Sequence, residues 1–257
     1  MMTINGVLLD LSGVLYVDDT AIAGAADSLQ RLRQKQLPHC FITNTTRRAP
    51  TVIRQSLLNL GFDIAAEDIF TASSAALEYL HQHQLKPFTL VHKNLRDEFA
   101  ALHTTDANAV LLGDAADDFN YRSLNQAFRI LMQNEQIPLI SMGYNRYFKE
   151  ADGLSLDLGA FTSALEFASG KQAIIVGKPA ADFFLQAVNK LGCEPQQVMM
   201  IGDDVESDVN GAIDAGLQAC LVRTGKYQPG DEHRMHEGAI VMDDVNAAIN
   251  EVLAQSV

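Results

Sequence analysis

The stretch that decides the fold is GVLLDLSGVL at residues 6–15, an apolar run with one carboxylate, Asp10, followed by a glycine turn. Short aliphatic and β-branched runs bounded by turn residues are typical of buried parallel strands. Asp10 stands where the hydrophobic run stops and the Ser12-Gly13 turn begins. The sequence therefore predicts a buried strand that carries one carboxylate at its carboxyl end.

Further runs of the same strand-like character recur along the chain. They lie at residues 39–43, 173–177, 198–202 and 219–223. Helical periodicity separates them, as in residues 50–60, which start with a proline and are followed by a glycine, and in residues 179–191. This alternation predicts a doubly wound parallel α/β sheet, in which ligands bind beyond the carboxyl ends of the strands.

The middle of the chain has a strand and helix pattern of its own. Strand-like runs lie at residues 88–92, 109–112 and 138–142, and a helical pattern covers residues 125–133. We therefore expect two domains. Residues 1–80 and 170–257 form the larger one, and residues 81–169 form a smaller α/β domain inserted into it.

Composition restricts the possible partners. The chain of 257 residues is 47% hydrophobic and 20% charged, which suits a globular core and a second, smaller one. A net charge of -13 without any lysine-arginine run argues against nucleic acid. The first residues carry no basic leader and no long apolar span, and the three cysteines form no C-x-x-C pair. We expect a cytoplasmic protein with reduced thiols and no membrane partner.

Polar and charged residues recur where the predicted strands end. They are Asp10, Thr43-Asn44, Lys178 and Asp203-Asp204, with Asp208 shortly afterwards. Each alone has an ordinary explanation, such as a helix cap, a turn or a surface lysine. Gathered at one sheet edge, they supply a nucleophile, hydrogen bonds to phosphate, a positive charge and carboxylates whose repulsion a hard cation relieves. We interpret them as a phosphoryl-transfer site.

These motifs resemble those of the haloacid dehalogenase superfamily phosphatases, and the resemblance covers nearly the whole chain. The matching segments are Asp10-Leu11-Ser12-Gly13-Val14, Thr43-Asn44, Lys178-Pro179 and Gly202-Asp203-Asp204 with Asp208. The resemblance implies a Rossmann-like hydrolase core, and the insert resembles the α/β, C2-type, cap domain of this superfamily. Residues 6–16, 146–150 and 223–226 further resemble the subgroup of the phospholysine phosphohistidine inorganic pyrophosphate phosphatases and their relatives.

The resemblance implies a role for each residue that would contact phosphate. Asp10 attacks phosphorus and becomes a phospho-aspartate. Thr43 and Asn44 bind the phosphoryl group, and Lys178 bridges the nucleophile and the transferring phosphate. The substrate implied is a small phosphorylated molecule, and a homodimer is expected because relatives with this cap commonly pair through it.

The resemblance also implies a Mg²⁺ site. The ion would bind Asp10, the backbone carbonyl of Ser12 and Asp203, which leaves room for a phosphate oxygen and water in an octahedral shell. Asp208 and Asp204 would orient these ligands.

Ser12 departs from the common pattern, in which a second aspartate protonates the leaving group and then activates water. A serine is a poor acid at neutral pH, and loss of general acid-base catalysis can cost roughly 100-fold to 10,000-fold in rate. We expect a preference for good leaving groups, as in pyrophosphate, acyl or aryl phosphates and phosphoramidates, where protonation of the leaving group matters less or comes from the substrate.

Two other functions fit parts of the pattern. A dehalogenase would use Asp10 as nucleophile without a metal, which the cluster at Asp203 and Asp204 argues against. A catalytically weak phosphate-binding or regulatory protein would explain Ser12, but it would need no nucleophile. Arg47 and Arg48 could attract an anionic substrate or simply begin a helix, and they stay outside the predicted site.

Overall fold

The computed structural model describes residues 3–150 and 153–256. The chain divides into two compact units. The first unit consists of Met1–Thr43, Pro50–Phe70 and Lys178–Val257, and the second unit of Asn44–Ala49 and Thr71–Gly177. The predicted division into two domains, residues 1–80 with 170–257 and residues 81–169, stays a prediction. Its boundaries differ from those of the two units, because the predicted boundary at residue 80 falls inside the helix Ala72–Gln82, which belongs to the second unit.

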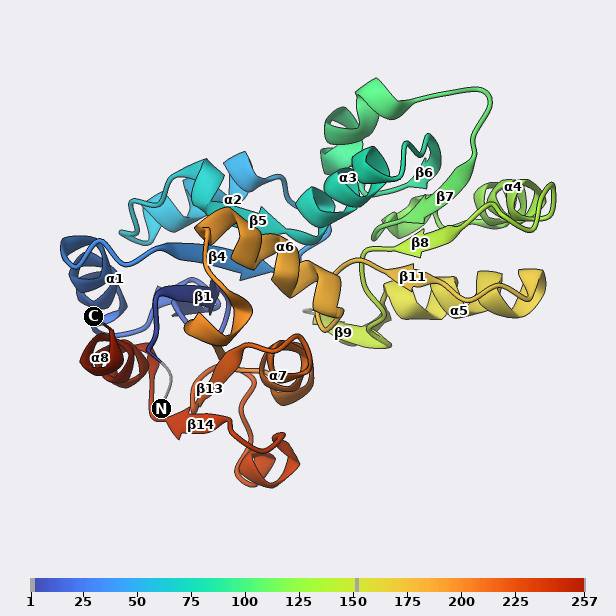
Figure 1. The fold of residues 1–257 in the computed structure, drawn as a ribbon. Coiled ribbons are helices and arrows are strands. Elements are labelled where there is room, and N and C mark those ends of the chain that lie inside the picture. The colour runs from blue at the N-terminus through green and yellow to red at the C-terminus, as the bar shows by residue number, and fades with distance from the viewer. Residues whose placement is uncertain (1–2, 151–152, 257) are drawn as a thin grey trace. The chain divides into compact units, whose positions relative to one another are not determined.

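A six-stranded sheet with the order β14-β13-β12-β1-β4-β5 forms the centre of the first unit (Figure 1). The strands are β1 (Gly6–Asp10), β4 (His39–Thr43), β5 (Ile69–Thr71), β12 (Val198–Gly202), β13 (Gln218–Val222) and β14 (Ile240–Met242). Strand β1 pairs in parallel with both β4 and β12, and β13 pairs in parallel with both β12 and β14. The predicted doubly wound parallel sheet is confirmed.

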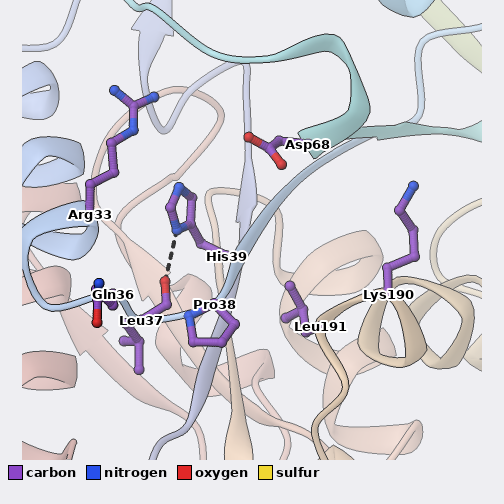
Figure 2. A pocket seen from close by; sticks show the side chains of 8 residues that line it. All are labelled: Arg33, Gln36, Leu37, Pro38, His39, Asp68, Lys190 and Leu191. Atoms are coloured by element: carbon purple, nitrogen blue, oxygen red, sulfur yellow. Dashed lines mark hydrogen bonds between the residues drawn. The ribbon is translucent and has the colours of Figure 1, made fainter.

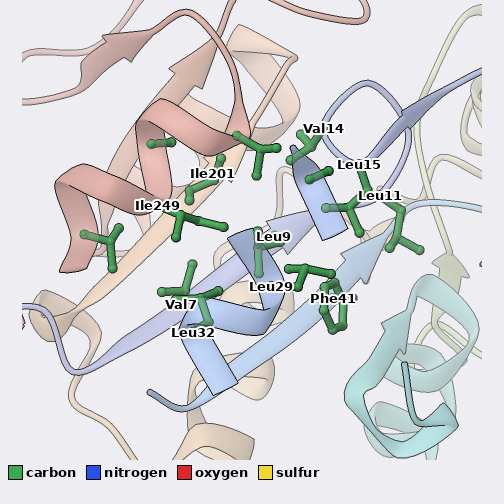
Figure 3. Close-up of a cluster of buried hydrophobic side chains, with 14 of the residues drawn as sticks. Val7, Leu9, Leu11, Val14, Leu15, Leu29, Leu32, Phe41, Ile201 and Ile249 are labelled. Carbon is green, nitrogen blue, oxygen red and sulfur yellow. The ribbon is translucent and has the colours of Figure 1, made fainter. Parts of the chain in front are cut away.

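Helices cover both faces of this sheet. Helices α1 (Ala25–Gln34), α2 (Pro50–Asn59) and α8 (Val245–Gln255) contribute to one buried cluster with the sheet. In this cluster Leu29, Leu32 and Ile249 lie with Val7, Leu9 and Phe41 from the strands (Figure 3). Helices α6 (Ala181–Leu191) and α7 (Gly211–Asp214) pack on each other on the opposite side (Figure 1). Strand side chains alternate between the two faces, so both faces are apolar.

The second unit has a four-stranded parallel sheet with the order β11-β8-β7-β6. The strands are β6 (Pro87–Leu90), β7 (Ala109–Leu112), β8 (Leu139–Ser141) and β11 (Ile174–Ile175). Its helices are α3 (Ala72–Gln82), α4 (Tyr121–Leu131) and α5 (Leu158–Ser169), with a 3₁₀-helix at Lys93–Leu102 and an antiparallel pair of strands, β9 (Tyr147–Glu150) and β10 (Gly153–Leu156). A separate hydrophobic cluster lies within this unit.

One predicted strand belongs to a different sheet from the one expected. Residues 173–177 were expected to lead Lys178 to the edge of the larger sheet, but β11 pairs with β8 of the smaller sheet, with Ile174 opposite Ile140. An apolar run shows that a strand is buried, but it does not show which neighbour the strand pairs with. Lys178 therefore starts the segment before α6 and does not end a strand of the larger sheet.

Short elements complete the structure. They are β2 (Tyr16–Val17), β3 (Thr20–Ala21), 3₁₀-helices at Ala66–Asp68, Ala116–Asp118, Pro195–Gln197 and Asp231–Arg234, and a π-helix at Val205–Asn210. Across residues 3–150 and 153–256, no helix combines the length and the hydrophobicity that a membrane crossing needs.

Candidate active site

The candidate active site lies where the order of the larger sheet reverses. From β1 the chain proceeds to β4 and β5 on one side, whereas β12, β13 and β14 lie on the other. Leu9 is level with Ile201, so the end of β1 at Asp10 lies beside Gly202, and Asp203 follows directly. Ligands of open α/β sheets bind in the crevice at such a switch point.

Lys178 joins two carboxylates in this crevice. Its Nζ lies 2.5 Å from Oδ1 of Asp10 and 2.6 Å from Oδ1 of Asp208, and all three side chains are buried. Burial alone would lower the pKa of Lys178, but the negative charges of Asp10 and Asp208 raise it above its ordinary value. The lysine is therefore a fixed positive charge beside the Asp10 carboxylate.

A buried acidic cluster accompanies this lysine. Carboxylate oxygens of Asp10, Asp203 and Asp208 lie within 4.8 Å of one another. Burial, and next the charges of Asp10 and Asp208, raise the pKa of Asp203 to about 7. Such repulsion is relieved by a hard cation, and carboxylate oxygens are ligands that Mg²⁺ prefers. The cluster therefore fits a magnesium ion.

The hydrogen bonds within the cluster distinguish its members. Asp208 accepts from Lys178 on Oδ1 and from the backbone N–H of Asp204 on Oδ2, at 3.3 Å. Among the described residues, Asp10 accepts on Oδ1 from the ammonium of Lys178. Asp203 accepts on Oδ2 from the backbone N–H of Lys226. Asp10 and Asp203 thus keep carboxylate oxygens for a cation, whereas Asp208 is committed to Lys178.

Local backbone geometry explains how Asp208 reaches the site. Asp208 lies in the π-helix, an element that is rare and often occurs at functional sites. A Cβ atom on Gly202 would lie 2.3 Å from the Cβ of Asp208, so the close approach depends on glycine at this position. Burial raises the pKa of Asp208, although Lys178 lowers it.

Asp204 serves as the helix cap. Its Oδ1 accepts from the backbone N–H groups of Glu206 at 3.1 Å and Ser207 at 3.0 Å. Burial would raise the pKa of Asp204, but the Ser207 N–H and the Lys226 ammonium lower it. Asp204 therefore holds the start of the π-helix that carries Asp208.

The structure also places three further residues of the predicted site, Thr43, Ser12 and Asn44. Thr43 ends β4 at the same sheet edge as Asp10, because Asp10 is level with Ile42. Ser12 is exposed in the turn after β1. Asn44 is the first residue of the second unit, where a Cβ on Gly177 would lie 2.9 Å from its Oδ1.

Arg47, which lies outside the predicted site, is part of a polar cluster in the second unit. Its Nε lies 2.5 Å from Oδ2 of the buried Asp114, and its guanidinium lies over the ring of Phe148 at 4.6 Å. Asp157 accepts from the N–H of Leu158 at 2.6 Å and caps α5. Asp114 and Asp157 therefore have structural partners within their own unit.

A separate cavity of about 400 Å³ lies at the opposite, amino end of β4. It is lined by Arg33, Gln36, Leu37, Pro38, His39, Asp68, Lys190 and Leu191 (Figure 2). Arg33 and Lys190 belong to the last turns of α1 and α6, where positive charge stabilises a helix. His39 bonds the carbonyl of Leu37 through Nδ1 at 2.9 Å. The helix ends account for Arg33 and Lys190, and the hydrogen bond accounts for His39.

Comparison with known proteins agrees with this geometry. A family model described as "Haloacid dehalogenase-like hydrolase" matches residues 7–105, and one described as "HAD-hyrolase-like" matches residues 175–248. Haloacid dehalogenase-like hydrolase domain-containing protein 2 of Pongo abelii is 44% identical over 233 residues, covering 91% of this chain and 89% of the relative. The human phospholysine phosphohistidine inorganic pyrophosphate phosphatase is 42% identical over 234 residues, covering 90% and 87%.

A similar fold occurs in the crystal structure of a 4-nitrophenylphosphatase from Thermotoga maritima. Its TM-score is 0.88 with 24% identity, covering 97% of both chains. The parallel sheet with helices on both faces makes this an α/β protein, and the acidic cluster at its switch point is a candidate metal site. The chain belongs to the haloacid dehalogenase-like hydrolase family. The family resemblance drawn from the motifs is confirmed, and so is the expectation of an enzyme.

Proposed function

We propose that this hydrolase is a magnesium-dependent phosphatase that cleaves a small phosphorylated compound through a phospho-aspartate on Asp10. The observation that carries the proposal is the buried pair of Asp10 and Lys178 beside Asp203. A fixed positive charge next to a strand-end carboxylate suits attack on an anionic phosphoryl group. Relatives named as phosphatases support the same reaction class.

The reaction has two chemical steps. A carboxylate oxygen of Asp10 forms a bond to phosphorus while the bond from phosphorus to the leaving group breaks, and the leaving group takes the electron pair. Water then attacks phosphorus, the bond to the Asp10 oxygen breaks, and inorganic phosphate is released. Lys178, Thr43 and Asn44 bind the phosphoryl oxygens and hold phosphorus in line with Asp10.

The proposed Mg²⁺ ligands are Asp10, the Ser12 carbonyl and Asp203. The bound ion supplies positive charge for the phosphoryl oxygens as negative charge shifts during transfer. Asp208 positions Lys178, and Asp204 positions Asp208 through the π-helix that it caps. The donor set is made of hard oxygens, as this ion prefers.

Ser12 determines the proposed substrate class. The exposed hydroxyl of Ser12 cannot donate a proton as an aspartic acid would, so substrates with good leaving groups should react best. We propose pyrophosphate, acyl or aryl phosphates and phosphoramidates. The name of the human relative includes phospholysine, phosphohistidine and pyrophosphate. The nitrogen of a P–N bond can carry its own proton, and a P–O–P bond releases phosphate, so these substrates depend less on an acid from the protein.

The test is release of phosphate from p-nitrophenyl phosphate and pyrophosphate, with and without Mg²⁺. Asp10→Asn removes the nucleophile, and Asp27→Asn makes the same change at an exposed position of α1. We expect magnesium-dependent release that Asp10→Asn abolishes and Asp27→Asn retains. Release that survives in Asp10→Asn would exclude the phospho-aspartate. Stable binding of both compounds without turnover would favour a phosphate-binding or regulatory protein.

We also propose a setting for this activity. The expected location is the cytoplasm, and the expected partners are the small-molecule substrate and a second copy of the chain. Light scattering tests the homodimer directly. A net charge of -13 disfavours the polyanion nucleic acid as a partner.

A further inference from the structure

The segment Thr224-Gly225-Lys226, which follows β13, contacts Asp203 directly. The backbone N–H of Lys226 donates to Oδ2 of Asp203 at 2.7 Å. The Thr224 hydroxyl donates to the carbonyl of Gly13 at 2.5 Å. Gly13 belongs to the turn after Asp10, so this segment connects the two turns that supply the proposed metal ligands.

The carboxylate of Asp203 lies in a slot between two glycines. A Cβ atom on Gly13 would lie 1.9 Å from Oδ2 of Asp203, and one on Gly225 would lie 2.1 Å from the same oxygen. Both glycines have positive φ, +90° for Gly13 and +61° for Gly225. A side chain at either position would push the carboxylate away, because contacts this short do not occur between unbonded atoms.

The ammonium of Lys226 forms an ion pair with the neighbouring carboxylate of Asp204. Its Nζ lies 3.1 Å from Oδ2 of Asp204, although 71% of the side chain is exposed. Exposed ion pairs contribute little, so the N–H group and the glycine slot carry more of the restraint on Asp203.

We propose that Thr224-Gly225-Lys226 is a positioning element that fixes the Asp203 carboxylate for Mg²⁺ and thereby sets the affinity for the ion. The inference rests on the proposed function, because it requires Asp203 to bind the metal. Groups that orient metal ligands typically change metal affinity by about 10-fold to 100-fold when they are altered.

The sharpest test compares Gly225→Ala with Gly192→Ala. Gly192 has a φ of +66°, close to that of Gly225, but a Cβ there would meet nothing within 4 Å. The pair therefore separates backbone strain from collision with Asp203 and with the Gly13 backbone, whose Cα a Cβ on Gly225 would meet at 2.4 Å. Isothermal titration with Mg²⁺ alone should show about 10-fold or weaker binding for Gly225→Ala and an unchanged dissociation constant for Gly192→Ala.

A second set of variants needs no change in backbone conformation. Thr224→Val removes the hydroxyl that bonds Gly13, whereas Thr224→Ser keeps it. We expect weaker Mg²⁺ binding in the first and wild-type binding in the second. Lys226→Met keeps the N–H on Asp203, so its effect should stay below about fivefold. Far-UV circular dichroism and cooperative melting of the magnesium-free variants establish that each one folds.

Two results would overturn the inference. One is equal Mg²⁺ affinity in wild type, Gly225→Ala and Thr224→Val, and the other is an equal loss in Gly225→Ala and Gly192→Ala. Neither depends on turnover, since the readout is metal binding. Failure of the proposed function has a different signature, which is unimpaired Mg²⁺ binding in wild type without phosphate release from any substrate.

Discussion

The ammonium of Lys178 lies 2.5 Å from Oδ1 of Asp10, inside the protein and in contact with Asp208 on its other side. One cation therefore balances two buried carboxylates. Such a group stabilises the folded chain and also keeps a positive charge where an anionic substrate would bind. The stabilising role and the substrate-binding role can be tested separately.

Lys178→Met should destabilise the magnesium-free protein by about 3–5 kcal/mol, because it leaves Asp10 and Asp208 as unpaired buried charges. Urea unfolding measures the loss, and Lys86→Met provides the same change at an exposed position just before β6. Adding Asp208→Asn to Lys178→Met should recover part of the stability. Wild-type stability in Lys178→Met would contradict the paired-charge description.

Asp203→Asn should stabilise the magnesium-free protein at neutral pH. The folded-state pKa of Asp203 is raised from 3.8 to about 7, so the folded chain binds more protons than the unfolded chain between these values. Stability contributed by this group therefore falls as pH rises through that window and stays low above it. The variant should lack this fall and gain a few kcal/mol at pH 8, since one pKa unit corresponds to about 1.4 kcal/mol.

Thermal melting from pH 4 to pH 8 in chelator tests this directly. The matched measurement adds Mg²⁺, which should raise the melting temperature of wild type and leave Asp203→Asn unchanged. If the Asp203→Asn variant still gains stability from Mg²⁺, Asp203 is not a ligand of the metal.

Ser12→Asp should increase activity on alkyl phosphate monoesters. The new carboxyl supplies the missing acid and base, so kcat/KM should rise by about 100-fold or more for alkyl esters and much less for p-nitrophenyl phosphate. Ser12→Ala is the control and should leave hydrolysis of good leaving groups nearly unchanged, because only the backbone carbonyl is needed. A collapse of activity in Ser12→Ala would show that the hydroxyl itself takes part in the reaction.

The three cysteines should differ in reactivity. Cys40 and Cys220 are buried, and burial raises the pKa of each thiol to about 12, whereas Cys193 is half-buried. At pH 8, Ellman's reagent should modify Cys193 in the folded protein and all three only after denaturation. Cys193→Ser should leave a folded protein without a reactive thiol. Rapid reaction in that variant would contradict the burial of the other two.

The strands of the larger sheet could be predicted because buried parallel strands consist of short apolar runs rich in β-branched residues. The runs at 39–43 and 198–202 coincide with β4 and β12, and the run that begins at Gly6 is β1. Once these strands are parallel neighbours, the residues at their carboxyl ends must meet at one edge. Asp10 and Asp203 were therefore predictable from strand ends alone.

The rest depends on contacts between distant segments, which no local pattern records. The run at 173–177 looks like the other buried strands, yet it joins the smaller sheet. The N–H of Lys226 reaches Asp203 across 23 positions of the chain, and no property of the lysine side chain predicts a backbone contact. Likewise, the need for glycine at Gly13 and Gly225 appears only when the carboxylate between them is placed.

The most direct test of the central claim is to find the covalent intermediate. The protein is mixed with p-nitrophenyl phosphate and Mg²⁺, quenched in acid during turnover, digested and analysed by mass spectrometry. We predict that one phosphoryl group will be found on the peptide that contains Asp10, and that it accumulates because Ser12 provides no base for the water step. Turnover with an unmodified Asp10 peptide at every quench time, or a phosphoryl group on another residue, would contradict the account.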